Sequence, residues 1–351
     1  MTKSIIVSSV ITLLFINMVS AQSVDFKYFG DISNNTLLME EDLNNEMLIG
    51  DHAIFFRTNL NDDFSFLGEL TLGQKNSEEY QITAERVLIK FKINKQIVGY
   101  AGKMHIPINY WNDVYHHGKL FFPTIDRPEF FKFFIPIHSI GLRLQNQNIG
   151  KLKFGYDIVL GDGISNDTQK YSIGKSVTAS LHFKPTPKSR YTIGFYYDTI
   201  KPDIISSHSG LRNRFHNAAV VNAVGNINYT LLTASLAHFG KKVEFLGEFI
   251  ANRTGDEADV KSWNGGMYIY NGYKLNEQTT LFSQFDQILV SSTDVFTTPL
   301  DLNKISAGFK YEFDYRINLK AQSGTCSISH KIPGISNERA YFIKIQLSYG
   351  F

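Results

Sequence analysis

The chain has 351 residues, and its 35 Lys and Arg against 33 Asp and Glu give a formal net charge of only +2. This balance lacks the basic excess of nucleic-acid-binding proteins, so we expect no nucleic-acid partner. Past the first 21 residues, no stretch approaches the roughly 18 consecutive apolar residues of a membrane-spanning helix, which excludes a helical membrane bundle. The single cysteine, Cys326, cannot form an internal disulfide. Aromatic residues nevertheless make up 14% of a chain that is only 43% hydrophobic.

The first 21 residues have the layout of a secretory signal peptide. One cation, Lys3, precedes an apolar run that ends at Val19, and Ser20-Ala21 supplies a small-residue cleavage site. The other interpretation is a membrane anchor, but polar residues interrupt the run, which is already short for a span. We therefore predict a signal peptide at 1–21 and a single mature domain at 22–351.

Apolar and polar residues alternate in many segments of the mature chain. From residue 341 to the carboxyl terminus the alternation is nearly unbroken, with Lys344, Gln346 and Ser348 on the polar face. Similar segments lie at 86–93, 152–160, 243–249 and 309–313. This period of two predicts β-strands with one apolar and one polar face. Soluble β-sandwiches alternate in the same way. The connections between the strands must therefore distinguish a soluble β-sandwich from a membrane β-barrel.

Short turns and longer polar segments follow one another in strict alternation. The seven short turns lie at 61–63, 94–95, 147–150, 185–188, 240–242, 274–278 and 314–315. The eight longer segments lie at 31–49, 74–83, 105–136, 161–173, 201–227, 253–262, 291–302 and 327–339. We therefore predict an all-β fold, a transmembrane antiparallel β-barrel of about 16 strands, within a range of roughly 14 to 18. Its short turns would be periplasmic, and its long loops would be external.

The carboxyl-terminal residues Tyr349-Gly350-Phe351 also fit a membrane barrel. In hydrocarbon every backbone N–H and C=O must be paired, so the first strand must join the last. A final amphipathic strand with an aromatic last residue resembles the signal that outer-membrane barrels present for insertion. The expected location is the outer membrane of a Gram-negative bacterium. The expected partners are outer-membrane lipid and, through the strand that ends at Phe351, the barrel-assembly machinery.

One stretch carries a more specific resemblance. The run from Gly102 to Asn112, followed by Tyr115-His116-His117-Gly118 and Arg127-Pro128-Glu129, resembles a stretch of porin-like outer-membrane proteins of Bacteroidetes. The wider chain is similar to the superfamily that includes the phosphate-selective porins. This resemblance implies a water-filled lumen and passive diffusion of small hydrophilic solutes. The resemblance does not imply phosphate selectivity, because no phosphate-binding arginine ladder can be matched residue by residue. A homotrimer and a monomer both stay open.

The segment 105–136 is the longest and the third of the long connections. In sixteen-stranded porins the third external loop commonly folds into the lumen, so the resemblance implies that this segment narrows the channel. The alternative is a loop that caps the barrel from outside. The candidate constriction residues are aromatic or charged, namely Lys103, His105, Tyr110, Trp111, His116, His117, Arg127 and Lys132.

Charged residues on the polar faces of the strands are expected to line the lumen. They are Arg86, Lys90, Lys92, Arg143, Lys153, Glu244, Glu248, Lys310, Arg316, Lys320 and Lys344. With Glu69, Asp157, Asp198 and Glu312 also expected to face inward, nine basic side chains oppose six acidic ones, which favours a small preference for anions. A register error of one residue would move a strand's charges to the lipid side.

No catalytic or metal chemistry is expected. Adjacent His116 and His117 would point to opposite faces of an extended chain, whereas zinc needs three or four converging ligands, so no metal or other cofactor is predicted. His138 and Ser139 would likewise face apart on a strand, which argues against a serine hydrolase. A passive channel is therefore the expected function. A closed structural or surface-binding barrel is the alternative, and a barrel hydrolase is a remote one.

Overall fold

The computed structural model describes residues 23–39, 42–74, 79–115, 119–165, 174–201 and 223–351. The signal peptide predicted for residues 1–21 lies outside these residues, as do His116 and His117 of the predicted constriction. Within the described ranges, no helix has the length and apolar character needed to cross a membrane.

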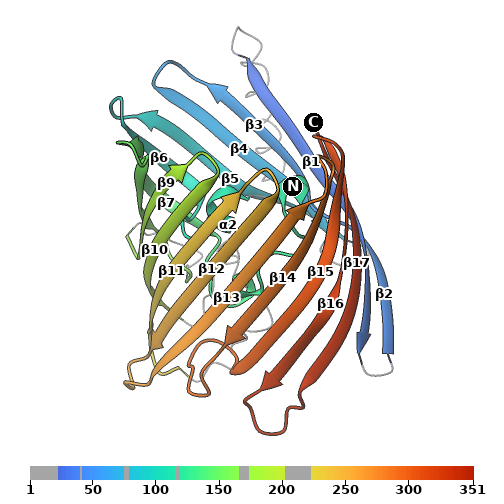
Figure 1. Cartoon of the computed structure of the whole chain (residues 1–351). Helices are drawn as coiled ribbons and strands as arrows, with labels where there is room; N and C mark the ends of the chain where they lie inside the picture. The colour runs from blue at the N-terminus through green and yellow to red at the C-terminus, as the bar shows by residue number, and fades with distance from the viewer. Residues whose placement is uncertain (1–22, 40–41, 75–78, 116–118, 166–173, 202–222) are drawn as a thin grey trace, which may run out of the picture.

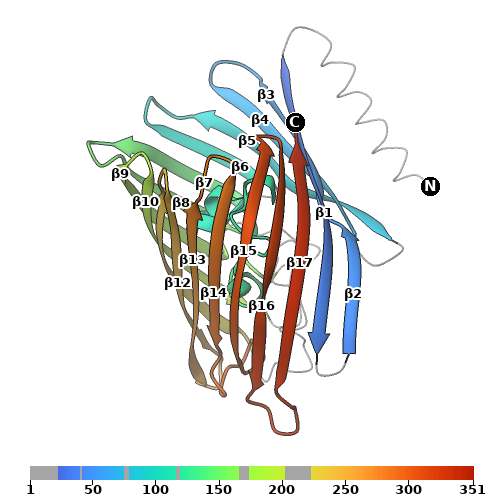
Figure 2. The ribbon, with the colours of Figure 1, turned by 45° about the vertical axis from the view of Figure 1, so that its right-hand side comes forward.

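Antiparallel strands form a closed barrel (Figures 1 and 2). The first strands are β1 (Val24–Met39), β2 (Asp42–Ile49), β3 (His52–Asn59), β4 (Phe64–Gln74), β5 (Tyr80–Lys92), β6 (Ile97–His105), β7 (His138–Ile149) and β8 (Phe154–Gly161). They are followed by β9 (Ser176–Thr186), β10 (Ser189–Ile200), β11 (Ile227–Phe239), β12 (Val243–Gly255), β13 (Lys261–Lys274), β14 (Thr279–Leu289), β15 (Leu300–Asp314), β16 (Ile317–His330) and β17 (Glu338–Gly350). Strand β1 pairs with β17, from Phe29 opposite Gly350 to Met39 opposite Ala340, and this pairing closes the ring.

Strands β2 and β3 are two halves of one bent strand. Both pair with β1, β2 along its carboxyl-terminal half and β3 along its amino-terminal half. The bend lies at Gly50, where a Cβ atom would collide with the carboxylate of Asp31. With β2 and β3 counted together, the 17 strand segments form a barrel of sixteen strands, which confirms the predicted fold class.

The connections follow the predicted alternation with one clear error. Short turns separate β3 from β4, and so on in pairs up to β15 and β16, close to the seven predicted positions. The prediction of a long loop at 31–49 was wrong, because most of that segment forms the β1–β2 hairpin. Its asparagines have low strand propensity, but pairing of β1 with strands on both sides overrides that preference. The predicted loop at 253–262 is also shorter, since β12 extends to Gly255 and β13 begins at Lys261.

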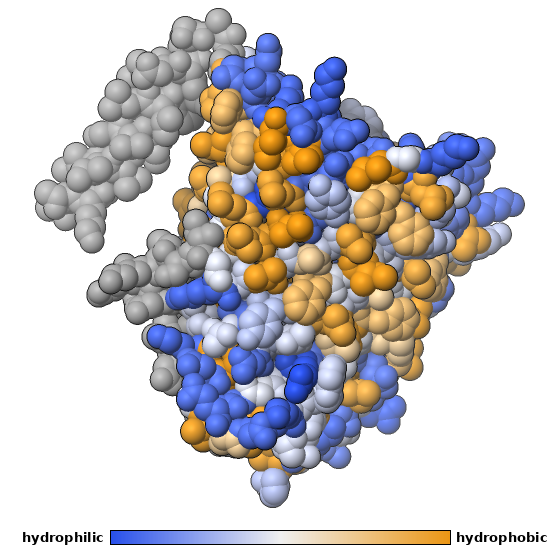
Figure 3. Space-filling view, turned by 90° about the vertical axis from the view of Figure 1, so that its left-hand side faces the viewer, coloured by the Kyte–Doolittle hydropathy of each residue, from blue (hydrophilic) through white to orange (hydrophobic). Residues whose placement is uncertain are grey.

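The outward face of the wall is apolar. Exposed apolar side chains recur at every second position of the strands, among them Leu70, Leu72, Val87, Ile89, Leu142, Leu144, Ile158, Leu160, Leu181, Ile193, Leu232, Leu236, Phe249, Leu281, Ile305, Phe309, Ile343, Ile345 and Leu347. Figure 3 shows many hydrophobic side chains across the middle of this side of the wall, with hydrophilic ones gathered above and below them. Such a large exposed apolar surface suits hydrocarbon and would be a liability in water.

Aromatic residues gather on this outer face near the short turns. The ring centroids of Phe64 and Phe91 lie 6.3 Å apart, and those of Tyr311 and Phe313 lie 5.0 Å apart. At the chain ends, Phe351 packs with its ring centroid 5.1 Å from that of Tyr28. Aromatic girdles of this kind mark the interfacial edges of transmembrane barrels, and they account for part of the high aromatic content.

The apolar outer face predicts that the cost of introducing a charge depends on its depth in the membrane. Ile305 lies in the middle of β15 and is 60% exposed, whereas Tyr315 lies in the following turn and is 80% exposed. Ile305→Arg should lower the free energy of unfolding from lipid vesicles by about 2–4 kcal/mol, because a charge near the bilayer midplane must be desolvated. The matched variant Tyr315→Arg should change it by about 1 kcal/mol or less. Denaturant titration in vesicles measures both, and equal losses would contradict a membrane-embedded wall.

Candidate channel constriction

The connection between β6 and β7 lies inside the barrel rather than above it. It contains the short helix α2 (Tyr110–Val114) and the 3-10 turns η1 (Lys119–Phe121) and η2 (Glu129–Lys132). Figures 1 and 2 show α2 within the ring of strands. We refer to the described residues of this connection, 106–115 and 119–137, as the inner segment. Asn109, with a left-handed φ of 64°, turns the chain into α2.

One side of the inner segment packs against the wall in an apolar core. Its Trp111, Phe122, Phe130, Phe133 and Phe134 are fully buried against inward residues of β10 to β16. The Trp111 ring centroid lies 5.1 Å from that of Phe122 and 5.5 Å from that of Tyr268. Each such ring contributes about 1.5–3 kcal/mol by burial. The water-filled lumen that the resemblance implied therefore cannot extend across this side of the barrel.

Two glycines in the wall allow this close packing. A Cβ atom at Gly266 of β13 would lie 3.0 Å from Cβ of Phe130. A Cβ at Gly194 of β10 would lie 3.2 Å from Cγ2 of Ile108. Glycine at these positions lets the inner segment approach the backbone of the strands directly.

Hydrogen bonds from the wall hold α2 at its amino-terminal end. The backbone N–H of Trp111 donates to Oε1 of Glu248 at 3.0 Å, and that of Tyr110 donates to Oγ of Ser235 at 3.0 Å. The Tyr229 hydroxyl donates to the carbonyl of Phe134 at 2.8 Å, near the other end of the segment. Glu248, predicted to line the lumen, is instead a buried anchor for the first amides of α2.

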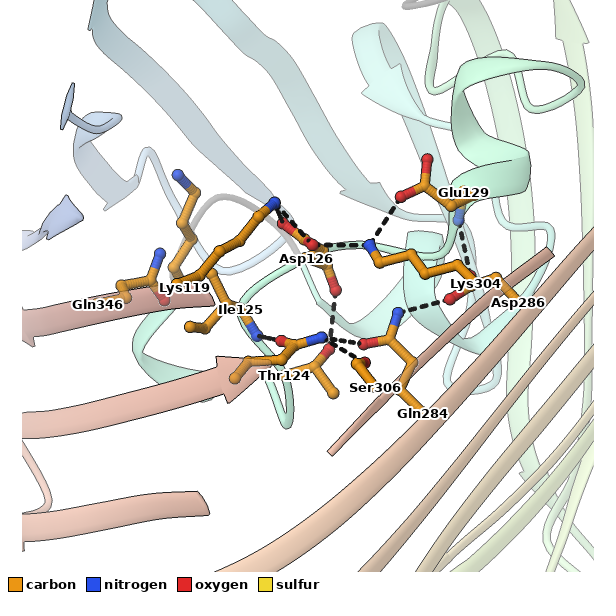
Figure 4. Close-up of polar contacts among 12 residues, drawn as sticks. Lys119, Thr124, Ile125, Asp126, Glu129, Gln284, Asp286, Lys304, Ser306 and Gln346 are labelled. Carbon is orange, nitrogen blue, oxygen red and sulfur yellow. Dashed lines mark hydrogen bonds and ion pairs between the residues drawn. The ribbon is translucent and has the colours of Figure 1, made fainter. Parts of the chain in front are cut away.

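A buried cluster of ion pairs joins the inner segment to the last strands (Figure 4). Nζ of Lys304 on β15 lies 2.7 Å from the Asp126 carboxylate and 2.8 Å from that of Glu129. Nζ of Lys344 on β17 lies 2.8 Å from Asp126. The backbone N–H of Glu129 donates to Oδ1 of Asp286 at 2.9 Å. We call this group of five residues the anchor cluster.

The anchor cluster keeps its two inner-segment carboxylates ionised. Burial by itself would raise the pKa of Asp126, but the ammonium groups of Lys304 and Lys344 outweigh it and hold that pKa below its usual value. Burial also opposes ionisation of Glu129, and Lys304 and Lys132 lower its pKa to about 2. The attraction is therefore present at every pH above the ordinary carboxylate range.

Side-chain amides extend this network along the wall. The backbone N–H of Ile125 donates to Oε1 of Gln322 at 3.1 Å. Gln322 donates in turn to Gln284 at 2.9 Å and to Ser306 at 2.7 Å, and Gln284 donates to Asp286 at 2.7 Å. Figure 4 shows Gln284, Ser306 and Asp286 near the inner segment. The buried donors and acceptors satisfy one another, which favours a single position of the segment.

The turn η1 is held by β16 and β1. Nδ2 of Asn318 donates to the carbonyl of Leu120 at 2.7 Å, and Nζ of Lys320 donates to that of Lys119 at 2.5 Å. Lys119 itself lies 3.1 Å from the Asp31 carboxylate. Lys320 was predicted to line the lumen, but it is fully buried beneath η1.

The opposite wall, from β3 to β10, carries charged side chains. Asp113 of α2 pairs with Arg190 of β10 and lies 3.5 Å from Arg143 of β7. Arg143 also lies 2.7 Å from Asp157. Arg86 of β5 pairs with Glu69 of β4. The helix α2 is therefore held between the apolar half and the charged half of the interior.

The remaining constriction candidates lie in different surroundings. The ring of His105 packs edge to face on that of His138, with centroids 4.5 Å apart. Tyr110 stacks on Phe239, and Arg127 lies over the Phe122 ring at 5.5 Å, where burial lowers the pKa of its guanidinium.

Two of these candidates are cations with nearby partners. Lys132 is exposed and pairs with Glu129 at 2.7 Å. Nζ of Lys103 donates to the carbonyl of Ala84 on the neighbouring strand at 2.6 Å. The candidates that the structure describes thus lie in separate surroundings, and Trp111 belongs to the apolar core.

Several predicted lumen charges lie in turns or at strand ends. Lys153 and Arg316 occupy the β7–β8 and β15–β16 turns, where both are exposed, so their assignment to the lumen wall was wrong. Alternation does not continue through a turn, which explains the error. Lys92 ends β5 and donates to the carbonyl of Asp62 in the adjacent turn.

Two further predicted lumen charges are paired near the short-turn end. Glu244 lies 2.9 Å from Lys274 and accepts from the Tyr270 hydroxyl at 2.7 Å. Lys310 lies 3.1 Å from Glu312. Lys90 faces the same side of the wall as Leu88 and Arg86.

Sequence reasoning missed the residues that do most of the anchoring. Lys304 was not among the predicted charges, although it lies six positions before Lys310 on the same face of β15. Extending the alternation of apolar and polar residues from Lys310 back along β15 would have predicted that Lys304 faces inward. Asp113, Asp126 and Glu129 lie in a short helix, a loop and a 3-10 turn, which are too short for a periodic pattern to indicate the direction of a side chain.

A cavity of about 520 Å³ lies beside the inner segment toward the short turns. One wall of this cavity is formed by β1, β3 and β4, and the other by the end of α2 and by η1. The cavity exists only because the inner segment is folded into the barrel.

Comparison with known proteins shows the fold class. No protein-family model matches the sequence, and no curated protein matches it. Among solved structures, an anion-selective porin from Comamonas acidovorans aligns with a TM-score of 0.67 at 9% identity, covering 94% of this chain and all of the porin. The outer membrane channel DcaP of Acinetobacter baumannii aligns with a TM-score of 0.63 at 8% identity, covering 95% and 98%.

Salmonella typhi OmpF, solved with daunomycin, aligns with a TM-score of 0.59 at 11% identity, covering 94% of this chain and 98% of OmpF. At sequence identities this low, the similarity shows a shared fold. The architecture shared with these proteins is that of the porins. The chain is a sixteen-stranded porin-like barrel with a segment folded into its interior.

The anchor cluster predicts unequal effects of its two lysines. The Lys304 side chain is 4% exposed and serves two carboxylates, whereas that of Lys344 is 22% exposed and serves one. Lys304→Met should cost about 3 kcal/mol of unfolding free energy, because Asp126 and Glu129 then each keep only one, more exposed lysine partner. Lys344→Met should cost about 1 kcal/mol. Denaturant unfolding with limited proteolysis of the inner segment measures both effects, and equal losses would exclude Lys304 as the central anchor.

The lowered carboxylate pKa values predict acid release of the inner segment. A group whose pKa is depressed on folding stabilises the fold above its unfolded value and loses that contribution as the pH falls. Trp111 fluorescence, recorded in a Trp263→Phe background that leaves one tryptophan, should stay constant from pH 8 to about 4 and change toward pH 2 and below.

The variant Asp126→Asn with Glu129→Gln provides the control for this titration. It should abolish the acid transition, because neither side chain can then lose a charge. A wild-type transition centred between about pH 5 and 7 that persists in this variant would show that other groups, such as histidines or the Glu248 carboxyl beside Trp111, control the fluorescence.

Proposed function

We propose that this protein is a porin-like channel for passive diffusion of small hydrophilic solutes across the outer membrane of a Gram-negative bacterium. The observation that carries the proposal is the inner segment, which is docked on one half of the interior and faces charged residues on the other. Charged side chains that line a narrow aqueous path are one way in which channels select solutes. The stretch from Gly102 to Glu129 supports a place among porin-like proteins of Bacteroidetes, similar to the phosphate-selective porin superfamily.

Several features support the membrane location. The apolar outer band suits lipid, the first 21 residues suit export, and the terminal strand suits recognition by the barrel-assembly machinery. In this location the short turns face the periplasm and the long loops face outside. Homotrimer formation is part of the proposal. It is supported by the trimer form named for the similar barrel OmpT of Vibrio cholerae, which aligns with a TM-score of 0.59 at 12% identity over 95% of this chain and all of OmpT.

The charges on the open side favour anions. Arg86, Arg143 and Arg190 are neutralised by carboxylates. By contrast, Lys27 and Arg57 have no ion-pair partner among the described residues. Low-dielectric walls focus the field of such unpaired charges on the permeating ion, which supports a modest anion preference.

A closed barrel is the second candidate, and one observation favours it. The apolar core fills one half of the interior. Any aqueous path through the barrel must therefore pass along the charged wall, and if that side is also filled, the barrel is closed. A closed barrel would still present its long loops outside the cell for binding.

Planar-bilayer recordings separate these two functions. The proposed channel gives stable conductance steps, while a closed barrel gives none. Arg57→Glu combined with Lys90→Glu should lower the anion-to-cation permeability ratio by roughly twofold or more, because two cations of the inner wall become anions. Lys153→Glu, at the same end of the barrel but in an exposed turn, is the matched control and should leave the ratio nearly unchanged. If the double variant and Lys153→Glu changed the permeability ratio equally, the inner wall would not be the surface that selects ions.

A further inference from the structure

The cavity beside the inner segment combines uncovered apolar side chains with unpaired charge. Phe121 of η1 is 56% exposed and Val114 of α2 is 37% exposed, although both lie inside the barrel. The ring centroid of Phe29 on β1 lies 5.3 Å from that of Phe121 and 5.4 Å from that of Phe55. These three rings form an apolar floor with edge-to-face contacts. Apolar surface left open in a concave site is typical of ligand pockets.

Cations border this floor on the barrel wall. Lys27 lies two residues before Phe29 on β1, and Arg57 lies two residues after Phe55 on β3, so both share the inward face with the rings. Neither has an ion-pair partner in the part of the chain that the structure describes. An ammonium and a guanidinium at the edge of an aromatic floor suit a ligand with one anionic end and one apolar end.

One acidic residue also reaches the cavity and limits the choice of ligand. Asp25 is the cross-strand neighbour of Arg57, so the charged edge carries two positive charges and one negative charge. This net charge favours a single carboxylate over a multiply charged anion. A volume of about 520 Å³ lies within the range of pockets that enclose small organic molecules.

We propose that this cavity binds small amphipathic anions, with an aromatic monocarboxylate as the representative ligand. The carboxylate lies between Lys27 and Arg57, and the apolar body packs on Phe29 and Phe121. This inference names the solute class of the proposed channel and therefore rests on it, since the ligand must reach the cavity through water. The barrel then selects solutes by weak binding in this cavity as well as by their size.

Fluorine NMR with para-fluorobenzoate tests this site without any ion current. Binding to the detergent-solubilised full-length barrel should be saturable, and fluoroacetate, which lacks the apolar ring, should bind at least tenfold more weakly. Lys27→Gln combined with Arg57→Gln should weaken fluorobenzoate binding at least tenfold. Phe121→Ala should weaken it about threefold or more, and the exposed position of Phe121 makes this truncation compatible with folding.

Lys153→Gln provides the matched control, because it removes a positive charge in an exposed turn at the same end of the barrel. Its affinity for fluorobenzoate should equal that of the wild type. Equal binding by all variants, or tighter binding of para-fluorobenzylammonium than of fluorobenzoate, would overturn the inference. Conductance without fluorobenzoate binding would overturn the ligand site alone. Binding that depends on Lys27 and Arg57, in a barrel that shows no conductance, would support the site and refute the channel.

Discussion

Pairing of the first strand with the last is the constraint on which the rest of this structure depends. Eleven residue pairs between β1 and β17 close the wall, and each unpaired backbone group in hydrocarbon would cost several kcal/mol. Closure creates an interior that is separated from lipid. Only in such an interior can a lysine such as Lys304 be nearly fully buried, because carboxylates of the inner segment reach it there.

The interior is divided into two unlike halves by the inner segment. On the side of β10 to β16, aromatic rings from wall and segment form a core like that of a soluble domain. On the side of β3 to β10, arginines and carboxylates face the helix α2. The apolar half determines where the segment lies. In the proposed channel, the charged half is the wall along which solutes would pass.

Alternation in the sequence was sufficient for the wall but not for what lies within it. It placed Lys344 and Gln346 on the polar face of the last strand, and the spacing of the turns predicted about sixteen strands, because the backbone ladder acts on every strand in the same way. It could not show that Trp111 and Glu248 would be buried, since burial of an inward residue depends on a separate segment that covers it. The failure at residues 31–49 has a related cause. Asparagine-rich chain favours turns locally, but pairing of β1 with β17 on one side and with β2 on the other imposes an extended conformation on it.

The anchor cluster also orders the events of folding. Asp126 meets Lys304 and Lys344, which follow it by 178 and 218 residues in the chain. Until β15 and β17 are in place, the two carboxylates of the inner segment lack these cations, and a charge without a partner disfavours entry into a dry interior. Contacts of such long sequence separation form late, because the intervening chain must first be organised. Docking of the inner segment is therefore a closing step of maturation, and only a completed barrel holds its internal loop in position.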